Sequence, residues 1–263
     1  MISFQGHGIL LDIEGTTSSV SFVYDVMFPF ARTHAADYVR EHWGEESLMS
    51  GLEFLAKDAG FDDFQSWCGD RPTEQQQETV IAETLRQMES DAKATGLKQL
   101  QGLIWKLGFD SGELKSHLFD EVPSALKRWY QAGVELRIYS SGSIGAQKLF
   151  FGNTIAGNLL ELFSGHYDTT IGGKKEAASY RAILQDLDDD PGQWLFISDI
   201  PAELDAAREA GFQVALSQRP GNADVTDPSR YPCLTSFDQI EVPDQTHGET
   251  PVSYTHLRAH ETS

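Results

Sequence analysis

The chain has 263 residues, of which 40% are hydrophobic, and its 40 acidic and 20 basic side chains give a net charge of −20. This length and composition predict one large folded domain or a core domain with an insert, and no apolar run approaches membrane-spanning length. The negative charge argues against nucleic acid and anionic membranes as partners, because both are polyanions.

The first five residues contain neither the basic segment nor the apolar run of a signal peptide. The two cysteines, Cys68 and Cys233, lie far apart and match no metal-binding or redox spacing. We therefore expect a cytoplasmic protein with reduced thiols.

An apolar run at residues 8–11 predicts a buried parallel strand, and the sequence Asp-Ile-Glu-Gly-Thr of residues 12–16 follows it directly. An acid at the end of such a strand lies at the carboxyl edge of the sheet, where open α/β folds bind ligands. Gly15 allows the backbone to turn sharply there. The Asp12 carboxylate can hold a hard cation or attack phosphorus, and the alternative is an acid that only caps a loop.

Residues 18–117 differ from the rest of the chain because helical periodicity dominates and strand signals are few. This stretch predicts an all-helical insert of ordinary domain size. Its large apolar residues are expected to form the core of the insert. Trp105 is left with two interpretations, because it can line a substrate pocket or pack within the insert.

Helices and strands alternate after the insert. Strands are predicted at residues 134–139, 167–171, 194–198 and 213–216, the last of which closes the series. Helices are predicted at residues 122–131 and 176–187, and a further helix follows residue 143 and runs through residue 151. The last helix is predicted to begin near Pro201 and to end at Gly211. This alternation predicts an α/β fold with a parallel sheet and right-handed crossovers.

Polar clusters follow four of the predicted strands. They are Asp12 with Glu14, Ser140 with Ser141, Lys174 with Lys175, and Asp199. The carboxyl ends of parallel strands share one edge, so these side chains can converge. Together they supply what phosphoryl transfer requires, namely carboxylates for a metal, hydroxyl and ammonium donors for phosphate, and a nucleophile.

Six segments resemble the haloacid dehalogenase superfamily, and most closely its enolase-phosphatase (acireductone synthase) branch of methionine salvage. They are residues 12–18, 101–105, 139–143, 146–149, 198–199 and 219–222, within a resemblance that spans residues 6 to 240. Most members of the superfamily carry Asp at the position of Glu14, so this glutamate is the most discriminating residue. The resemblance implies a Rossmann-like core at residues 1–17 and 118–245, with a helical cap at 18–117 inserted after the first strand.

The resemblance also implies roles for the polar clusters. One Mg²⁺ per subunit would be held by Asp12, Glu14 and Asp199. The substrate would be bound by Ser140 and Ser141, on its phosphate or its carbonyl side, and by Lys174, which would neutralise phosphate charge. Catalysis would fall to Asp12 as nucleophile, to Glu14 as a possible acid or base, and to Lys174, which the spacing favours over Lys175. We expect Glu203 to be a helix-capping or solvated acid, and the base for enolisation is not assigned.

The reaction implied is the conversion of 2,3-diketo-5-methylthiopentyl-1-phosphate to acireductone and phosphate, by enolisation and then through an aspartyl phosphate. The cap would close over this small phosphorylated diketone, and the protein would be a monomer. An alternative is a phosphatase of the same superfamily that acts on another small phosphate monoester. A metal-free dehalogenase would leave Glu14 and Asp199 without a purpose, and intact Asp12, Lys174 and Asp199 argue against a catalytically silent binding module.

Residues 251–263 show no apolar period and no capping signals. They resemble a translated sequencing-library adapter, and we expect them not to be native. His256 and His260 have the spacing of metal ligands on a helix, but this interpretation of the tail excludes them from the site.

Overall fold

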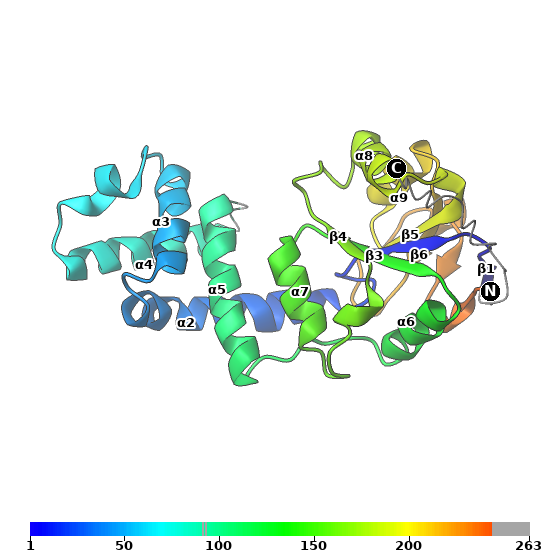
Figure 1. Cartoon of the computed structure of the whole chain (residues 1–263), viewed down its shortest axis with the longest axis horizontal. Helices are drawn as coiled ribbons and strands as arrows, with labels where there is room; N and C mark the ends of the chain where they lie inside the picture. Colours follow the sequence, from blue (N-terminus) through cyan, green and yellow to red (C-terminus); the bar gives the residue numbers. More distant parts are fainter. Residues whose placement is uncertain (91, 93, 244–263) are drawn as a thin grey trace, which may run out of the picture.

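The molecule has a parallel β-sheet flanked by helices at one end and a group of helices at the other (Figure 1). This computed structural model describes residues 1–90, 92 and 94–243. The proposed adapter-derived tail, with His256 and His260, lies outside the described residues. No helix in the described part of the chain is long and apolar enough to cross a bilayer.

The central sheet has six parallel strands in the order β4-β3-β2-β5-β6-β7. Their bounds are Gly8–Leu11 for β2, Glu135–Tyr139 for β3, Gly165–Tyr167 for β4, Trp194–Ser198 for β5, Gln213–Ser217 for β6 and Cys233–Leu234 for β7. Strand β2 lies between β3 and β5, so the winding of the chain reverses there. The carboxyl ends of β2 and β5 therefore border the crevice where such folds bind ligands.

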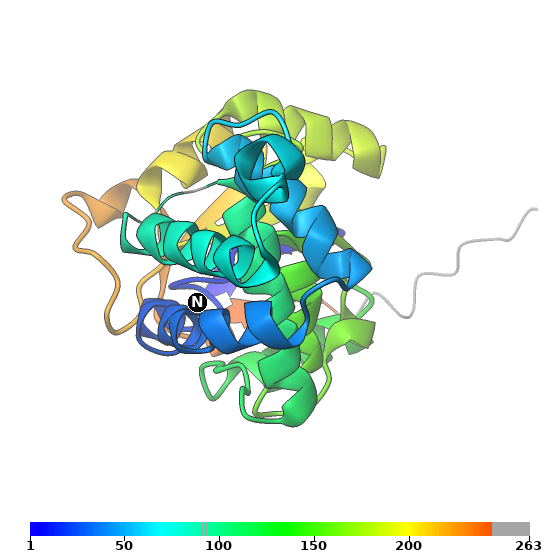
Figure 2. The same cartoon turned by 90° about the vertical axis from the view of Figure 1, so that its left-hand side faces the viewer.

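Helices cover both faces of the sheet (Figures 1 and 2). Their bounds are Val122–Gln131 for α6, Ile144–Gly152 for α7, Ala177–Leu187 for α8 and Pro201–Glu209 for α9. Leu10 and Phe196 belong to the core that includes residues of α8 and α9, whereas Leu11 and Ile197 belong to the core that includes residues of α6 and α7. Because alternate strand residues point to opposite faces, each apolar strand fills both cores.

The strand after α7 is shorter and earlier than predicted, because it ends at Tyr167 and not at Ile171. The side chain of Asp168 explains why β4 ends at Tyr167. This side chain accepts hydrogen bonds from the backbone N–H of Thr170 at 2.9 Å and of Ile144 at 3.1 Å, which favours a turn over a continued strand.

The prediction that the strand at residues 213–216 closes the series was wrong, because β7 extends the sheet. In addition, β1 (Ile2–Ser3) pairs in parallel with β8 (Ile240–Glu241) in a separate two-stranded sheet. Strands of two residues are too short to show a period in the sequence. Short helical turns join the longer elements at Leu160–Leu162, Pro191–Gln193, Pro228–Arg230 and Phe237–Gln239.

The segment between β2 and α6 is helical, and no β-strand occurs between residues 20 and 115 where the structure describes them. The helices are α1 (Val20–Phe22), α2 (Phe28–Glu41), α3 (Glu46–Asp58), α4 (Thr73–Glu89) and α5 (Thr95–Ser111), with π-helical turns at Val23–Met27 and Gln65–Gly69. We call this helical segment the cap. Figure 1 shows α5 as the cap helix that lies beside α7 of the core, and the two helices are in contact.

Candidate active site

Three of the predicted site residues meet where β2, β4 and β5 end. Asp12 follows β2, Asp199 follows β5 and Lys174 lies in the loop between β4 and α8, and all three side chains are buried. The Lys174 ammonium lies 2.6 Å from Asp12 Oδ1. The backbone N–H of Asp12 donates to the carbonyl of Ile197 in β5 at 3.0 Å, which fixes the end of β2 against the end of β5.

Glu203 is the fourth member of this cluster, and the prediction that it is a solvated or capping acid was wrong. Its carboxylate lies 2.7 Å from Lys174 Nζ and accepts a hydrogen bond of 2.8 Å from the Ser198 hydroxyl. The residue is buried because the first turn of α9 directs this side chain toward the ends of the strands. The Lys174 ammonium therefore bridges two carboxylates.

Two tyrosines hold the loop that carries Lys174. The Tyr180 hydroxyl donates to the Lys174 carbonyl at 2.7 Å, and the Tyr139 hydroxyl donates to the Gly172 carbonyl at 2.9 Å. Burial acts to lower the pKa of Lys174, but the carboxylates of Asp12 and Glu203 outweigh it and the pKa is raised. The side chain therefore remains an ammonium ion at neutral pH.

The cluster contains more negative than positive charge. Burial, reinforced by the carboxylates of Asp12 and Glu203, raises the pKa of Asp199 to about 7, although Lys174 acts in the opposite direction. Burial and Asp12 also raise the pKa of Glu203. Three carboxylates around one ammonium form a site that an added cation would stabilise.

Gly15 brings the loop after β2 against Asp199. Its backbone has φ +69°, a left-handed conformation that favours glycine, and a Cβ at this position would overlap the Asp199 carboxylate. The Gly15 carbonyl accepts hydrogen bonds from the Ser217 hydroxyl at 3.0 Å and the Asn222 amide at 2.9 Å. The loop after β6 thus holds the turn in place.

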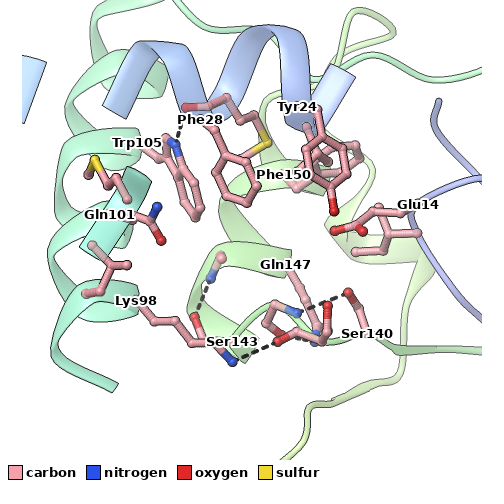
Figure 3. Close-up of a pocket in the computed structure, with 18 of the residues that line it drawn as sticks. Glu14, Tyr24, Phe28, Lys98, Gln101, Trp105, Ser140, Ser143, Gln147 and Phe150 are labelled. Atoms are coloured by element: carbon pink, nitrogen blue, oxygen red, sulfur yellow. Dashed lines mark hydrogen bonds between the residues drawn. The ribbon is translucent and has the colours of Figure 1, made fainter. Parts of the chain in front are cut away.

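Ser140, Ser141 and Glu14 line a cavity of about 400 Å³ between the cap and the core (Figure 3). The loop with the two serines is held by Gln147 of α7, whose amide donates to the carbonyls of Gly142 and Tyr167, each at 2.8 Å. Lys98 of the cap approaches the same loop, with its ammonium 3.4 Å from the Ser141 carbonyl.

The opposite wall of this cavity is apolar. It includes Met27, Phe28, Trp105 and Phe150. Trp105 fits both of its earlier interpretations, because its ring lines the cavity while its indole N–H donates to the Met27 carbonyl at 2.8 Å. A ligand in this cavity would have a polar end near the serines and an apolar end within the cap.

Glu14 faces the cavity, where its carboxylate and the Tyr24 hydroxyl point toward one another (Figure 3). Within the described ranges, no three His, Cys, Asp or Glu side chains are gathered as a set of metal ligands. The structure thus brings Asp12 together with Lys174 and places Asp199 in the same buried cluster, and the metal-binding role of Glu14 stays a prediction.

Sequence reasoning did not assign a role to Arg219, which anchors both connections to the cap. The guanidinium is buried, lies 2.6 Å from Glu121 Oε1 and donates to the Thr16 carbonyl at 3.3 Å. It also stacks over the ring of Phe119, 4.5 Å from the centroid. The run at residues 219–222 was noted as part of the family resemblance, but only the fold shows that it clamps these connections.

This fold and buried cluster are those of a haloacid dehalogenase-like hydrolase, whose family model matches residues 7–211. The chain belongs to this family.

Within that family the chain groups with the enolase-phosphatases. It is 44% identical over 219 residues to the enolase-phosphatase E1 of Drosophila simulans, which covers 83% of this chain and 86% of the relative. It is 44% identical over 246 residues to the enolase-phosphatase E1 of Xenopus tropicalis, and the match covers 90% of this chain and 95% of the relative. The crystal structure of the UTR4 protein from Saccharomyces cerevisiae matches with a TM-score of 0.73 and 31% identity, and covers 89% of this chain and all of that one. The family resemblance predicted from the sequence is confirmed.

Proposed function

We propose that this enzyme converts 2,3-diketo-5-methylthiopentyl-1-phosphate to acireductone and phosphate, the enolase-phosphatase step of methionine salvage. One observation carries the proposal. The Asp12–Lys174–Glu203 cluster lies at the sheet edge, and the adjoining residues Ile13 and Glu14 already line the cavity with the polar and apolar ends. Relatives over 40% identical that bear the name enolase-phosphatase support the same reaction.

The phosphatase half uses Asp12 as nucleophile. A carboxylate oxygen attacks phosphorus, the bond from phosphorus to the C1 oxygen breaks, and an aspartyl phosphate forms. Water then attacks this intermediate, which releases phosphate and regenerates the carboxylate. Lys174 offsets the negative charge that develops between the Asp12 carboxylate and the phosphate oxygens.

The enolase half comes first and takes a proton from C1, the carbon that bears the phosphate. Negative charge then develops on the neighbouring carbonyl oxygen and needs hydrogen-bond donors. Ser140 and Ser141 line the cavity on its polar side, and in this proposal their hydroxyls serve as such donors. Glu14 faces the same space and is the residue we propose as acid or base.

A divalent cation fits the buried cluster, because its carboxylates outnumber its one ammonium and the pKa of Asp199 is raised to about 7. Mg²⁺ usually binds proteins through one or two carboxylates, and takes its remaining ligands from water and substrate phosphate. We propose one Mg²⁺ per subunit on Asp12 and Asp199, with Glu14 contributing to the same site. When bound, the ion would reduce the repulsion between the phosphate and the Asp12 carboxylate.

We also propose that the protein is a cytoplasmic monomer without nucleic-acid or membrane partners. This part of the proposal rests on the net charge of −20 and on the family resemblance. The decisive experiment supplies the diketone phosphate with Mg²⁺ and follows enol absorbance and phosphate release together. We expect both signals, and both should disappear in EDTA. Brisk hydrolysis of another phosphate ester without any enol from the diketone would identify a phosphatase of different specificity, the second candidate.

A further inference from the structure

One face of α5 forms part of the cavity wall. Lys98, Gln101 and Trp105 are spaced three and four residues apart, so they project from the same side of the helix. All three line the cavity, and Figure 3 shows them along the cap side, opposite the serine loop. The proposed chemistry assigns no role to Gln101.

The Gln101 side chain presents a polar amide to the cavity. The residue is only 8% exposed, and its amide makes no hydrogen bond to any residue that the structure describes. Figure 3 shows the amide pointing into the cavity. Neither amide atom is among the fully buried unpaired atoms of the described residues, so the amide is open to the cavity and can hydrogen-bond to a ligand there.

Gln147 in the same cavity provides a comparison. It is also buried, but its amide N–H groups donate to the carbonyls of Gly142 and Tyr167. Gln147 thus has a structural role that the fold itself satisfies. Gln101 lacks such a role among the described residues, so the missing partner is expected from a ligand.

The position of Gln101 indicates which part of the ligand it meets. The residue lies on α5 between Lys98, whose ammonium is 3.4 Å from the Ser141 carbonyl, and the aromatic wall at Trp105. It therefore faces the middle of a ligand that places its polar end near the serines and its apolar end in the cap. A neutral amide that can both donate and accept suits an uncharged carbonyl oxygen.

We propose that Gln101 is a substrate-binding and specificity-determining residue, whose amide donates a hydrogen bond to a carbonyl oxygen of the diketone. The proposal rests on the proposed function and adds to it. The cap then selects the substrate by two features, a carbonyl at Gln101 and an apolar tail at Trp105. A site that hydrogen-bonds a substrate group discriminates strongly against compounds that lack it, because the buried donor is left unpaired.

The test replaces Gln101 by Met, which has nearly the same volume and helix propensity but no amide. Gln99→Met is the matched control, because Gln99 is exposed on the same helix and does not line the cavity. Each protein is assayed on the diketone phosphate and on phenyl phosphate, which has no carbonyl, and its melting temperature is measured.

We expect Gln101→Met to lower kcat/KM for the diketone phosphate roughly 10- to 100-fold, with less than about a twofold change for phenyl phosphate. Its melting temperature should change little, since the amide makes no hydrogen bond to the described residues. Gln99→Met should change neither activity.

An unchanged rate on the diketone, or a parallel loss on both substrates with a lower melting temperature, would overturn this role for Gln101. If the unaltered enzyme hydrolyses phenyl phosphate but never the diketone, the proposed function itself fails and the inference falls with it. The wild-type assay therefore separates the two failures.

Discussion

The adjacent lysines of the loop before α8 offer a sharp test, because one is buried in the site and its neighbour is exposed. Lys174 lies between the carboxylates of Asp12 and Glu203, whereas Lys175 is exposed to solvent. We expect Lys174→Met to abolish phosphatase activity and to destabilise the fold. Lys175→Met should have little effect on either, since exposed charges contribute little to stability.

The size of the effect follows from burial. Both partners of the Lys174 ammonium are less than a tenth exposed. Removing one member of a buried ion pair leaves uncompensated charge and costs about 3–5 kcal/mol of unfolding free energy. For a chain of this length, that corresponds to a melting temperature lower by roughly 10 °C.

The unfolding free energy lost in Lys174→Met should depend on pH, and the direction of this dependence follows from the carboxylates. In Lys174→Met, the pKa of Glu203, which burial and Asp12 already raise, loses the opposing effect of the ammonium and rises further. A carboxyl whose folded pKa exceeds its unfolded value stabilises the fold at low pH, and this contribution is lost as pH rises through the folded pKa. The deficit in unfolding free energy relative to wild type should therefore grow as the pH rises.

Urea unfolding of the wild type and both variants at several pH values, in EDTA so that no bound cation replaces the ammonium, measures this directly. Phosphate release is assayed on the same preparations with Mg²⁺ present. If Lys174→Met were as stable as Lys175→Met across this pH range, the ammonium would not be compensating buried carboxylates. If the two variants were equally active, its role in catalysis would be refuted.

Three further predictions concern the carboxylates. Asp12→Asn should abolish phosphate release without altering the circular dichroism spectrum, and normal turnover would exclude Asp12 as nucleophile. Gly15→Ala should lower activity by more than roughly 100-fold because its Cβ would overlap Asp199, whereas Gly112→Ala, with a similar positive φ of +76° but open space around it, should retain activity. Because the pKa of Asp199 is about 7 without metal, calorimetry should show Mg²⁺ affinity rising about tenfold from pH 6 to pH 8, with proton release at the lower pH; affinity independent of pH would contradict this.

The acids at the strand ends could be predicted from the sequence, because a short apolar run followed directly by Asp is typical of a buried strand that ends at the carboxyl edge of the sheet. Asp12 and Asp199 both follow fully buried strands, and parallel pairing brings those ends together. The spacing favoured Lys174 over Lys175 as the site lysine, and Lys174 is the one whose side chain is buried beside Asp12. In each case the pattern is local and the convergence follows from the topology.

Glu203 and Gln101 could not be predicted in the same way. Each lies on a helix, and a sequence shows that a helix is amphipathic more readily than it shows which neighbour a polar side chain will face. Glu203 resembles any acid in a first helical turn, yet α9 directs it onto Lys174. The burial of Gln101 depends on how the cap meets the core, a contact between segments far apart in the chain.

The charge of the chain also bears on how the site works. A phosphate ester approaching a protein of net charge −20 meets a repulsive field, and the buried cluster adds three carboxylates against the one ammonium of Lys174. If Asp12 attacks phosphorus as proposed, this local excess must be compensated, and Lys174 is already shared with Glu203. In the proposed mechanism the compensation would arrive with the ligands, so cation and phosphate binding would strengthen each other by the same factor, as linkage requires. In the proposed mechanism, the nucleophile would thus stay buried and ion-paired until cation and substrate are both present.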